Sequence, residues 1–210
     1  MFGVELIVGA VMGFFGSVPL AGPVALLVMT RGLSGNFKEA RQIAVGAAIA
    51  EGLLAGWVFA GLGLLYSQLP QLEGLVEWLG SFALIGVGLW FLIRGVAQKA
   101  PDLEASDETN ASFVLGVGLV LGNPGMIGTW GGALAALEGT GIVQVSSIGA
   151  IGIGLGVFLG VLGWFLLMLR LIRSYGSALN PAALNFAVRG IGLALAITGS
   201  ISAVSLLGEM

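Results

Sequence analysis

The sequence predicts an all-α integral membrane protein, and its composition and the length of its apolar runs both indicate that class. Hydrophobic residues make up 57% of the 210 residues, charged residues make up only 9%, and the mean hydropathy is +1.04. Water-soluble domains carry about 25% charged residues. A membrane-spanning helix needs about 20 apolar residues, and six runs of the chain are long enough. These runs cover roughly 3–30, 40–65, 76–97, 112–137, 143–170 and 183–207.

Lys and Arg residues predict how these helices are oriented. They follow the first, third and fifth runs, whereas the loops after the second and fourth runs carry only acidic charges (Glu73, Glu77, Glu138). Since cytoplasmic loops are enriched in Lys and Arg, we expect a multi-pass protein of the bacterial cytoplasmic (inner) membrane with both termini outside the cytoplasm. No positive segment precedes the first run, which is therefore expected to be a retained span. The cations used here are Arg31, Lys38, Arg41, Arg94, Lys99, Arg170 and Arg173.

The one long polar stretch, 98–112, divides the runs into two groups of three. We therefore expect a first three-helix repeat (1–100), an acidic cytoplasmic linker (101–111) and a second three-helix repeat (112–210) within one transmembrane domain. An odd number of spans in each half gives the halves opposite orientations, so a shared fold would make them an inverted repeat.

Two of the runs contain Gly and Pro residues that interrupt a helix. The first run contains GSVPLAGPVALL (16–27), and the fourth contains Gly122-Asn123-Pro124-Gly125. Proline removes a backbone donor and clashes with the preceding turn, so helices 1 and 4 are expected to be broken near the midplane. Matched interruptions are a typical sign of a transporter's binding site, although prolines also kink membrane helices without a functional role.

Two ionisable residues lie well inside predicted spans. Glu51 is close to the middle of the second run, and Arg189 is several residues into the sixth. A charge at the bilayer centre costs at least about 2.5–3.5 kcal/mol, so each is a candidate for function. Because desolvation favours the neutral form of a carboxyl group, Glu51 is the expected proton-coupling residue. Arg189 is either its ion-pair partner or a side chain that reaches the cytoplasmic surface.

The broken helices supply a second kind of polar site. The N–H groups at the start of a half-helix attract anions such as carboxylates, and unpaired backbone is tolerated at this depth only in a cavity or inside protein. We therefore predict one central solute site, with no metal and no catalytic residue. Its candidate residues are Ser17, Pro19, Gly22, Pro23, Glu51, Asn123, Pro124, Gly125, Thr129 and Trp130.

Glycines at four-residue spacing occur on two of the runs. Gly152, Gly156 and Gly160 follow one another on the fifth run, and Gly52 and Gly56 lie on the second. Small residues at this spacing let helix backbones approach closely. We interpret them as packing residues, either within the protomer or across a homodimer.

The composition excludes several functions. The chain contains no Cys and no His, so disulfides, imidazole metal ligands and a thiol oxidoreductase are excluded, and neither a cofactor nor enzymatic activity is expected. The net charge of −3 is distributed over loops and forms no basic patch, so nucleic acid is not an expected partner.

Several short segments resemble the lysine exporter superfamily, and the threonine/homoserine-type amino-acid exporters in particular. A Gly-Pro break that leads into a short basic loop, an acidic residue in a Gly-rich second span, and an Asn-Pro in the fourth span are all similar. The similar segments are AGPVALLVMTRGLSGNFKEA (21–40), GAAIAEGLLAG (46–56), LGNPGMIG (121–128), GVFLGVLGWFLL (156–167) and Arg189 to Gly192.

The resemblance implies a six-span inner-membrane exporter of amino acids or other small solutes, driven by the proton gradient and often a homodimer. It assigns the family's break to Gly22-Pro23, its acidic position to Glu51 and its Asn-Pro to Asn123-Pro124. Three positions depart from the family pattern. Ala-Gly-Pro replaces the common Pro-Gly-Pro, Glu replaces Asp at residue 51, and Gly125 replaces a Lys that often follows the Asn-Pro.

Together these observations favour a secondary exporter of a small zwitterionic solute, in which one three-span repeat rocks against the other. The expected partners are the solute and the lipid bilayer. The alternative is an exporter of inorganic cations within the same superfamily, although one carboxylate without Cys or His is a poor transition-metal site. A purely structural membrane protein would leave the matched breaks and Glu51 without a role.

Overall fold

The computed structural model describes residues 2–18, 23–68, 109–123, 125–138 and 146–175, and short stretches within 78–93 and 186–204. Throughout these residues the regular secondary structure is helical, so the predicted all-α class is confirmed for them. The helices are α1 (Phe2–Ser17), α2 (Pro23–Leu33), α3 (Phe37–Gln68), α5 (Thr109–Leu121), α6 (Gly125–Glu138) and α7 (Ser147–Tyr175).

Two of these helices, α3 and α7, are each long and apolar enough to cross a membrane. A third span arises if the bent pair α5 and α6 is counted as one, and the axes of that pair differ by 62°. Both α1 and α2 are shorter apolar helices. The predicted runs 76–97 and 183–207 lie largely outside the described residues, and the positions described within them are helical.

The residues at the helix ends, and not the limits of the apolar runs, explain where these helices begin and end. The first helix ends at Ser17 and α2 begins with Pro23, a position where a missing N–H removes no helical hydrogen bond. At the start of α7 the Ser146 hydroxyl accepts a hydrogen bond from the Gly149 N–H at 3.0 Å, which caps the helix. The interruptions predicted in the first and fourth runs are therefore present, between α1 and α2 and between α5 and α6.

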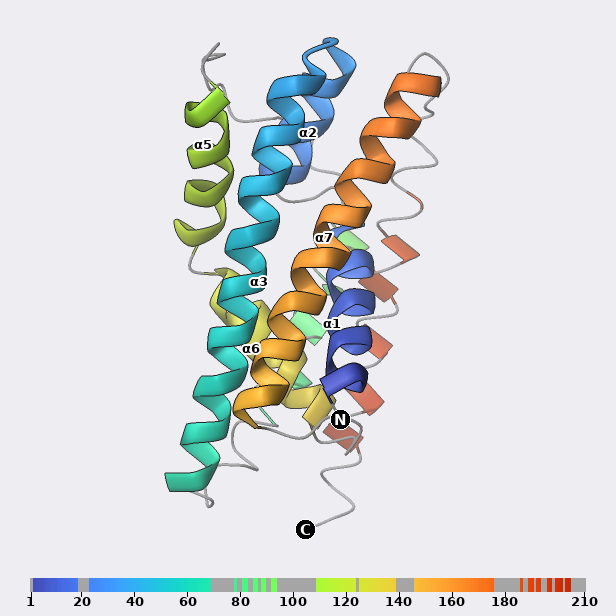
Figure 1. Cartoon of the computed structure of the whole chain (residues 1–210). Helices are drawn as coiled ribbons and strands as arrows, with labels where there is room; N and C mark the ends of the chain where they lie inside the picture. Colours follow the sequence, from blue (N-terminus) through green and yellow to red (C-terminus); the bar gives the residue numbers. More distant parts are fainter. Residues whose placement is uncertain are drawn as a thin grey trace.

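The antiparallel helices α3 and α7 pack against each other, while α1 packs along α7 and α5 packs along α3 (Figure 1). Glycines allow these contacts to be made by backbone. A β-carbon at Gly9 would lie 2.5 Å from the carbonyl oxygen of Ile153, and one at Gly52 would lie 2.7 Å from that of Gly154. Gly152, Gly156 and Gly160 of the fifth run face α1 in the same chain, and Gly154 faces α3. Their predicted packing role is confirmed, and it is fulfilled within the protomer.

The α1–α7 and α3–α5 contacts share one register. On α3, a β-carbon at Gly46 would clash with Phe113 of α5; on α7, one at Gly156 would clash with Leu6 of α1. The partner helices contribute a glycine of their own, three residues after Phe113 and after Leu6. On α5, Gly116 contacts Ile43 of α3; on α1, Gly9 contacts Ile153 of α7. Equivalent positions in the two contacts therefore differ by a constant residue number. The difference is 110 between α3 and α7, and 107 between α1 and α5.

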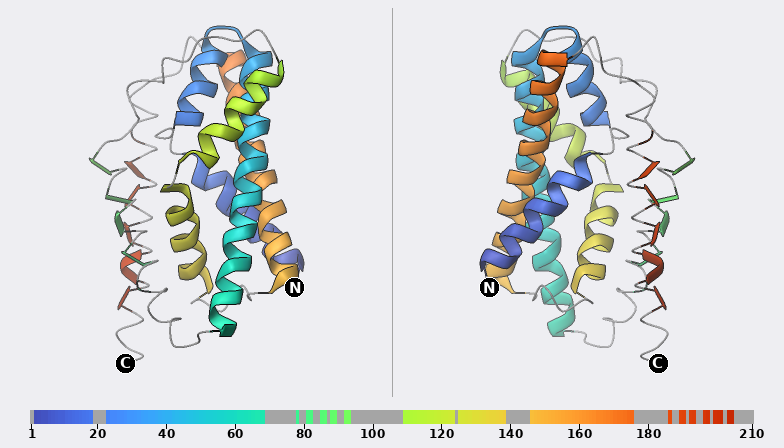
Figure 2. Two further views of the ribbon diagram at one scale, coloured as in Figure 1. Left: turned by 90° about the vertical axis from the view of Figure 1, so that its left-hand side faces the viewer. Right: turned by 90° about the vertical axis from the view of Figure 1, so that its right-hand side faces the viewer.

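The remaining described elements lie on one side of this block. Figure 2 shows α2 and α6 between α3 and the described residues of 78–93 and 186–204. These last two segments contact each other, since a β-carbon at Gly88 would lie 2.6 Å from the carbonyl oxygen of Gly192. The interfaces of α2 and α6 with α3 are smaller than those of α5 and α7.

Candidate functional site

Glu51 lies near the middle of α3 and is half-buried. Residues seven positions apart share a helix face, so Glu51 lies on the same face as Val58. Val58 in turn contacts α6, where a β-carbon at Gly131 would lie 3.8 Å from its Cγ1 atom. Glu51 is therefore on the side of α3 that carries α6.

The break between α5 and α6 lies at the height of Glu51. Gly46 of α3 sits between Phe113 and Val117 of α5, and both helices run from the same end of the bundle (Figure 1). At 1.5 Å per residue, six residues further along α3 reach Gly52, and six further along α5 reach its last residue, Leu121. The carboxyl end of α5 is thus level with Glu51.

The end of α1 is close to the same height. Gly13 of α1 contacts Val157 of α7, and the neighbouring residue Phe158 contacts Gly52 of α3. Gly13 is therefore about level with Gly52, and α1 ends one turn later, at Ser17. Both helix interruptions begin within about one turn of Glu51 along the bundle axis.

At the second break the chain turns tightly around Asn123. The N–H of Asn123 donates to the carbonyl oxygen of Val120 at 3.2 Å, and its own carbonyl oxygen accepts from the N–H of Met126 at 3.0 Å. Gly125 is the first residue of α6, and Pro124 lies outside the described residues.

At the first break, the Ser17 hydroxyl donates to the carbonyl oxygen of Gly13 at 2.8 Å, so this donor is used within α1. Pro19 and Gly22 lie outside the described residues, and Pro23 is the first residue of α2. The next residues, Val24 to Leu26, are buried. Helix geometry gives the first N–H groups no partner within α2, so this end carries partial positive charge toward the break.

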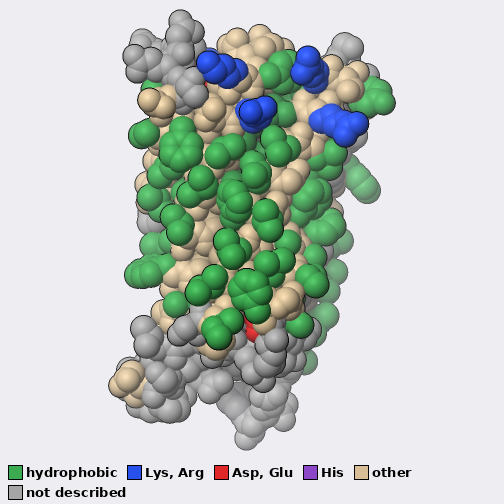
Figure 3. All heavy atoms as spheres, viewed as in Figure 1, with side chains coloured by type: hydrophobic (Ala, Val, Ile, Leu, Met, Phe, Trp, Pro, Cys, Tyr) green, Lys and Arg blue, Asp and Glu red, His purple; other side chains and the backbone are tan. Residues whose placement is uncertain are grey.

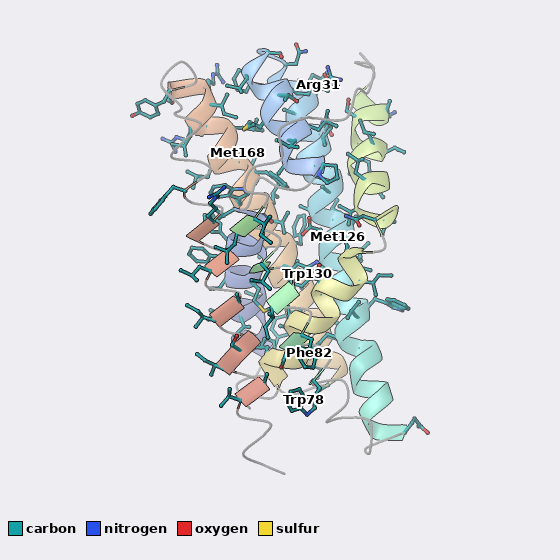
Figure 4. All side chains as sticks on the ribbon, turned by 180° about the vertical axis from the view of Figure 1, so that it is seen from behind. Arg31, Trp78, Phe82, Met126, Trp130 and Met168 are labelled. Carbon is teal, nitrogen blue, oxygen red and sulfur yellow. The ribbon has the colours of Figure 1, made fainter. Side chains whose placement is uncertain are left out.

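Three other predicted site residues differ in their surroundings. Trp130 of α6 is only 7% exposed and belongs to the hydrophobic core, whereas Thr129 beside it is exposed. Figure 4 shows Met126 and Trp130 on successive turns of α6. Arg189 is exposed, and in the described part of the chain no ion pair joins it to Glu51.

Glu5 in α1 carries a buried carboxyl group that is not among the residues predicted from the sequence. Glu5 is 2% exposed, and its Oε2 atom has no hydrogen-bond partner among the described residues. Its Cβ atom would lie 3.0 Å from a β-carbon at Gly152 of α7. Its position inside the first apolar run was the available signal.

Interrupted apolar helices, with the carboxyl group of Glu51 at the level of the interruptions, are an arrangement typical of a membrane transporter. The sequence matches the family model of the LysE type translocators over residues 14–200, and the chain therefore belongs to this family. Members of this family are transporters and not enzymes, and they export amino acids or similar solutes. Comparisons with curated proteins and with solved structures found no match.

Proposed function

We propose that the protein is a proton-coupled secondary exporter of amino acids or related small zwitterionic solutes. The observation that carries the proposal is the position of Glu51, half-buried in the middle of α3 and level with the ends of α1 and α5. A lone carboxyl group at this depth is costly unless it binds something. Membership of the LysE type translocators supplies the class of cargo.

The two charges of a zwitterion match two features of the site. Its carboxylate would lie at the amino end of α2 or α6, where free N–H groups and the helix dipole favour an anion. Its ammonium group would face Glu51. When the solute leaves on the outer side, Glu51 takes up a proton there and releases it to the cytoplasm. Each inward proton supplies about 2.3 kcal/mol per 100 mV of membrane potential.

The proposed architecture is six spans arranged as two inverted three-helix repeats. The shared register of the α1–α7 and α3–α5 contacts supports it, because both sets of glycines and carbonyl groups recur at constant separations. The orientation follows from charge: the described cations other than Arg189 lie at the end where α2 turns into α3. That end is proposed to face the cytoplasm.

The resemblance to threonine/homoserine-type exporters extends the proposal to small neutral amino acids and to a homodimer. Gly125 replaces the Lys that often follows the Asn-Pro, so the site has one cation fewer beside α6. The glycines of α7 are used within the protomer. A homodimer would therefore use other surfaces, such as the α3 face with exposed Leu53 and Trp57.

The test is transport by purified protein in proteoliposomes, screened over amino acids with and without an imposed proton gradient. Wild-type protein should move at least one amino acid faster with the gradient. Glu51→Gln, which keeps the side chain's size and removes its titratable proton, should abolish the gradient-driven component, and Glu51→Asp should retain part of it. Wild-type rates in Glu51→Gln, or transport of inorganic cations in place of amino acids, would contradict the proposal.

A further inference from the structure

A groove with a volume of about 510 Å³ lies between the start of α3 and the end of α7. It is separate from the site around Glu51, because it lies at the end of the bundle where α2 turns into α3. The lining includes four cationic residues and two leucines: Lys38, Arg41, Arg170, Arg173, Leu166 and Leu169.

The four cations are all exposed, and Figure 3 shows Lys and Arg side chains together at this end of the molecule. The prediction that the chain forms no basic patch is therefore wrong for the folded protein. Lys38 and Arg170 are more than a hundred residues apart in the chain, and only the antiparallel packing of α3 and α7 brings their two segments together.

Among the residues that the structure describes, no acidic side chain lines the groove to balance these charges. The nearest acidic residue of α3, Glu39, has its Oε1 atom 3.2 Å from the Nε atom of Arg31 and is thus already paired. The guanidinium of Arg173 lies over the ring of Phe37, 5.8 Å from its centroid. That contact orients the cation without cancelling its charge.

A favourable interaction with the helix dipole explains the positions of only some of these cations. Arg170 and Arg173 near the carboxyl end of α7 are favourable to the helix dipole, but Lys38 in the first turn of α3 is unfavourable there. In the register described above, Lys38 and Arg41 correspond to Ile148 and Ile151 of α7, which are exposed apolar residues. The packing of this helix pair therefore does not require positive charge.

The groove opens toward an apolar surface. Leu166 in its wall is 42% exposed, and further along the same helix Leu159 and Leu155 are 50% and 47% exposed. In a membrane-spanning helix, such exposed leucines face lipid chains. A ligand with a negative head and a long apolar tail can use both parts of this surface.

We propose that this groove binds the phosphate group of an anionic phospholipid, with the lipid's acyl chains along the exposed leucines of α7. The cations lie at the ends of α3 and α7, each of which is long and apolar enough to span a membrane. That is the depth of the lipid phosphates. Basic pockets between transmembrane helices on the cytoplasmic side are suited to anionic headgroups.

The test uses the full-length protein in vesicles of phosphatidylcholine and phosphatidylglycerol. The preference for spin-labelled phosphatidylglycerol over spin-labelled phosphatidylcholine is measured by electron paramagnetic resonance. Wild-type protein should prefer phosphatidylglycerol. Each cation removed should lower this preference about fivefold, so the double variant Arg41→Gln/Arg170→Gln should largely lose it. Arg41→Lys/Arg170→Lys should keep most of it, and 5 mM inorganic phosphate should not displace the label.

Arg189→Gln is the matched control, because it removes one exposed cation that does not line the groove. It should leave the preference unchanged. Wild-type preference in Arg41→Gln/Arg170→Gln, or displacement by inorganic phosphate, would overturn the proposal. A third outcome would also overturn it: no preference in the wild-type protein, and a preference in the variant Asp102→Asn/Glu104→Gln/Asp107→Asn/Glu108→Gln. In that case the acidic segment of this chain would occupy the groove.

Discussion

Gly156 of α7 lies directly against the carbonyl oxygen of Leu6 of α1, so close that a β-carbon at residue 156 would overlap it. The contact is between two backbones, and neither can give way as a flexible side chain would. Gly156→Ala should therefore lower the free energy of unfolding by about 1–3 kcal/mol, as overpacking does. Thermal unfolding of purified protein in detergent, followed by tryptophan fluorescence, measures the change.

Gly163, two turns later on the same helix, is the control for this prediction. A β-carbon there would lie 3.9 Å from Cδ2 of Phe14, which is an ordinary contact. Since Ala favours a helix over Gly by up to about 1 kcal/mol, Gly163→Ala should be neutral or slightly stabilising. Equal melting temperatures for the two variants would contradict the backbone contact.

Gly35 is the residue at which the chain turns from α2 into α3. Its φ angle is +84°, in the left-handed region that residues with a β-carbon adopt at a cost of about 1–2 kcal/mol. Gly35→Ala should destabilise the protein by that amount, and Gly35→Asn should destabilise it less, because Asn tolerates this region. The order wild type, Asn, Ala in melting temperature is the expected result. A different order would show that the turn relaxes.

The ion pair of Arg31 and Glu39 joins α2 to α3 across this turn, with both side chains largely buried (17% and 13% exposed). Glu39→Gln removes the carboxylate that lies 3.2 Å from the Arg31 Nε atom and should cost about 1–3 kcal/mol. The double variant Arg31→Gln/Glu39→Gln should be less destabilised than the sum of the single variants. A double-mutant cycle measured by thermal unfolding tests this, and strict additivity would mean that the pair contributes nothing.

The Oε2 atom of Glu5 is buried and finds no hydrogen-bond partner in the described part of the chain, and an unsatisfied polar atom costs about 1–3 kcal/mol. Glu5→Met has similar volume and removes that atom, so the melting temperature should rise. Glu5→Gln is the comparison variant, since it keeps a polar group in the same place. If Glu5→Met instead melts earlier, then the Glu5 carboxyl group stabilises α1 through a contact of its other oxygen.

Much of the helical architecture could be predicted because apolar runs and prolines act locally. The runs 40–65 and 143–170 correspond to α3 and α7, and Pro23 begins α2 as a helix-starting proline should. The helices nevertheless extend beyond the runs, to Gln68 and Tyr175. Helical backbone hydrogen bonds continue through polar residues, so a fall in hydropathy does not end a helix.

The packing partners could not be predicted in the same way. The chain has 37 glycines, and sequence spacing does not tell which of them meets which helix. Gly160 fits against Ala10 of α1, for instance, while Gly154 meets α3. Glu51 was identifiable as a lone carboxylate in the middle of a run, whereas Glu5 was missed at the edge of one. The cationic groove was not visible because its two halves are far apart in the chain.

The glycine contacts also limit how the protein can move. They join α1 to α7, α7 to α3 and α3 to α5 in one continuous series of backbone contacts. This series takes helices from both halves of the chain, so the two halves cannot rock apart as rigid bodies without separating backbones that touch. Among the described helices, α2 and α6 have smaller interfaces with α3 than α5 and α7 have, and each follows an interruption of its helix. The proposed central site could therefore open and close by hinge motion of these two half-helices, which separates fewer of the described backbone contacts than rocking of the two halves would.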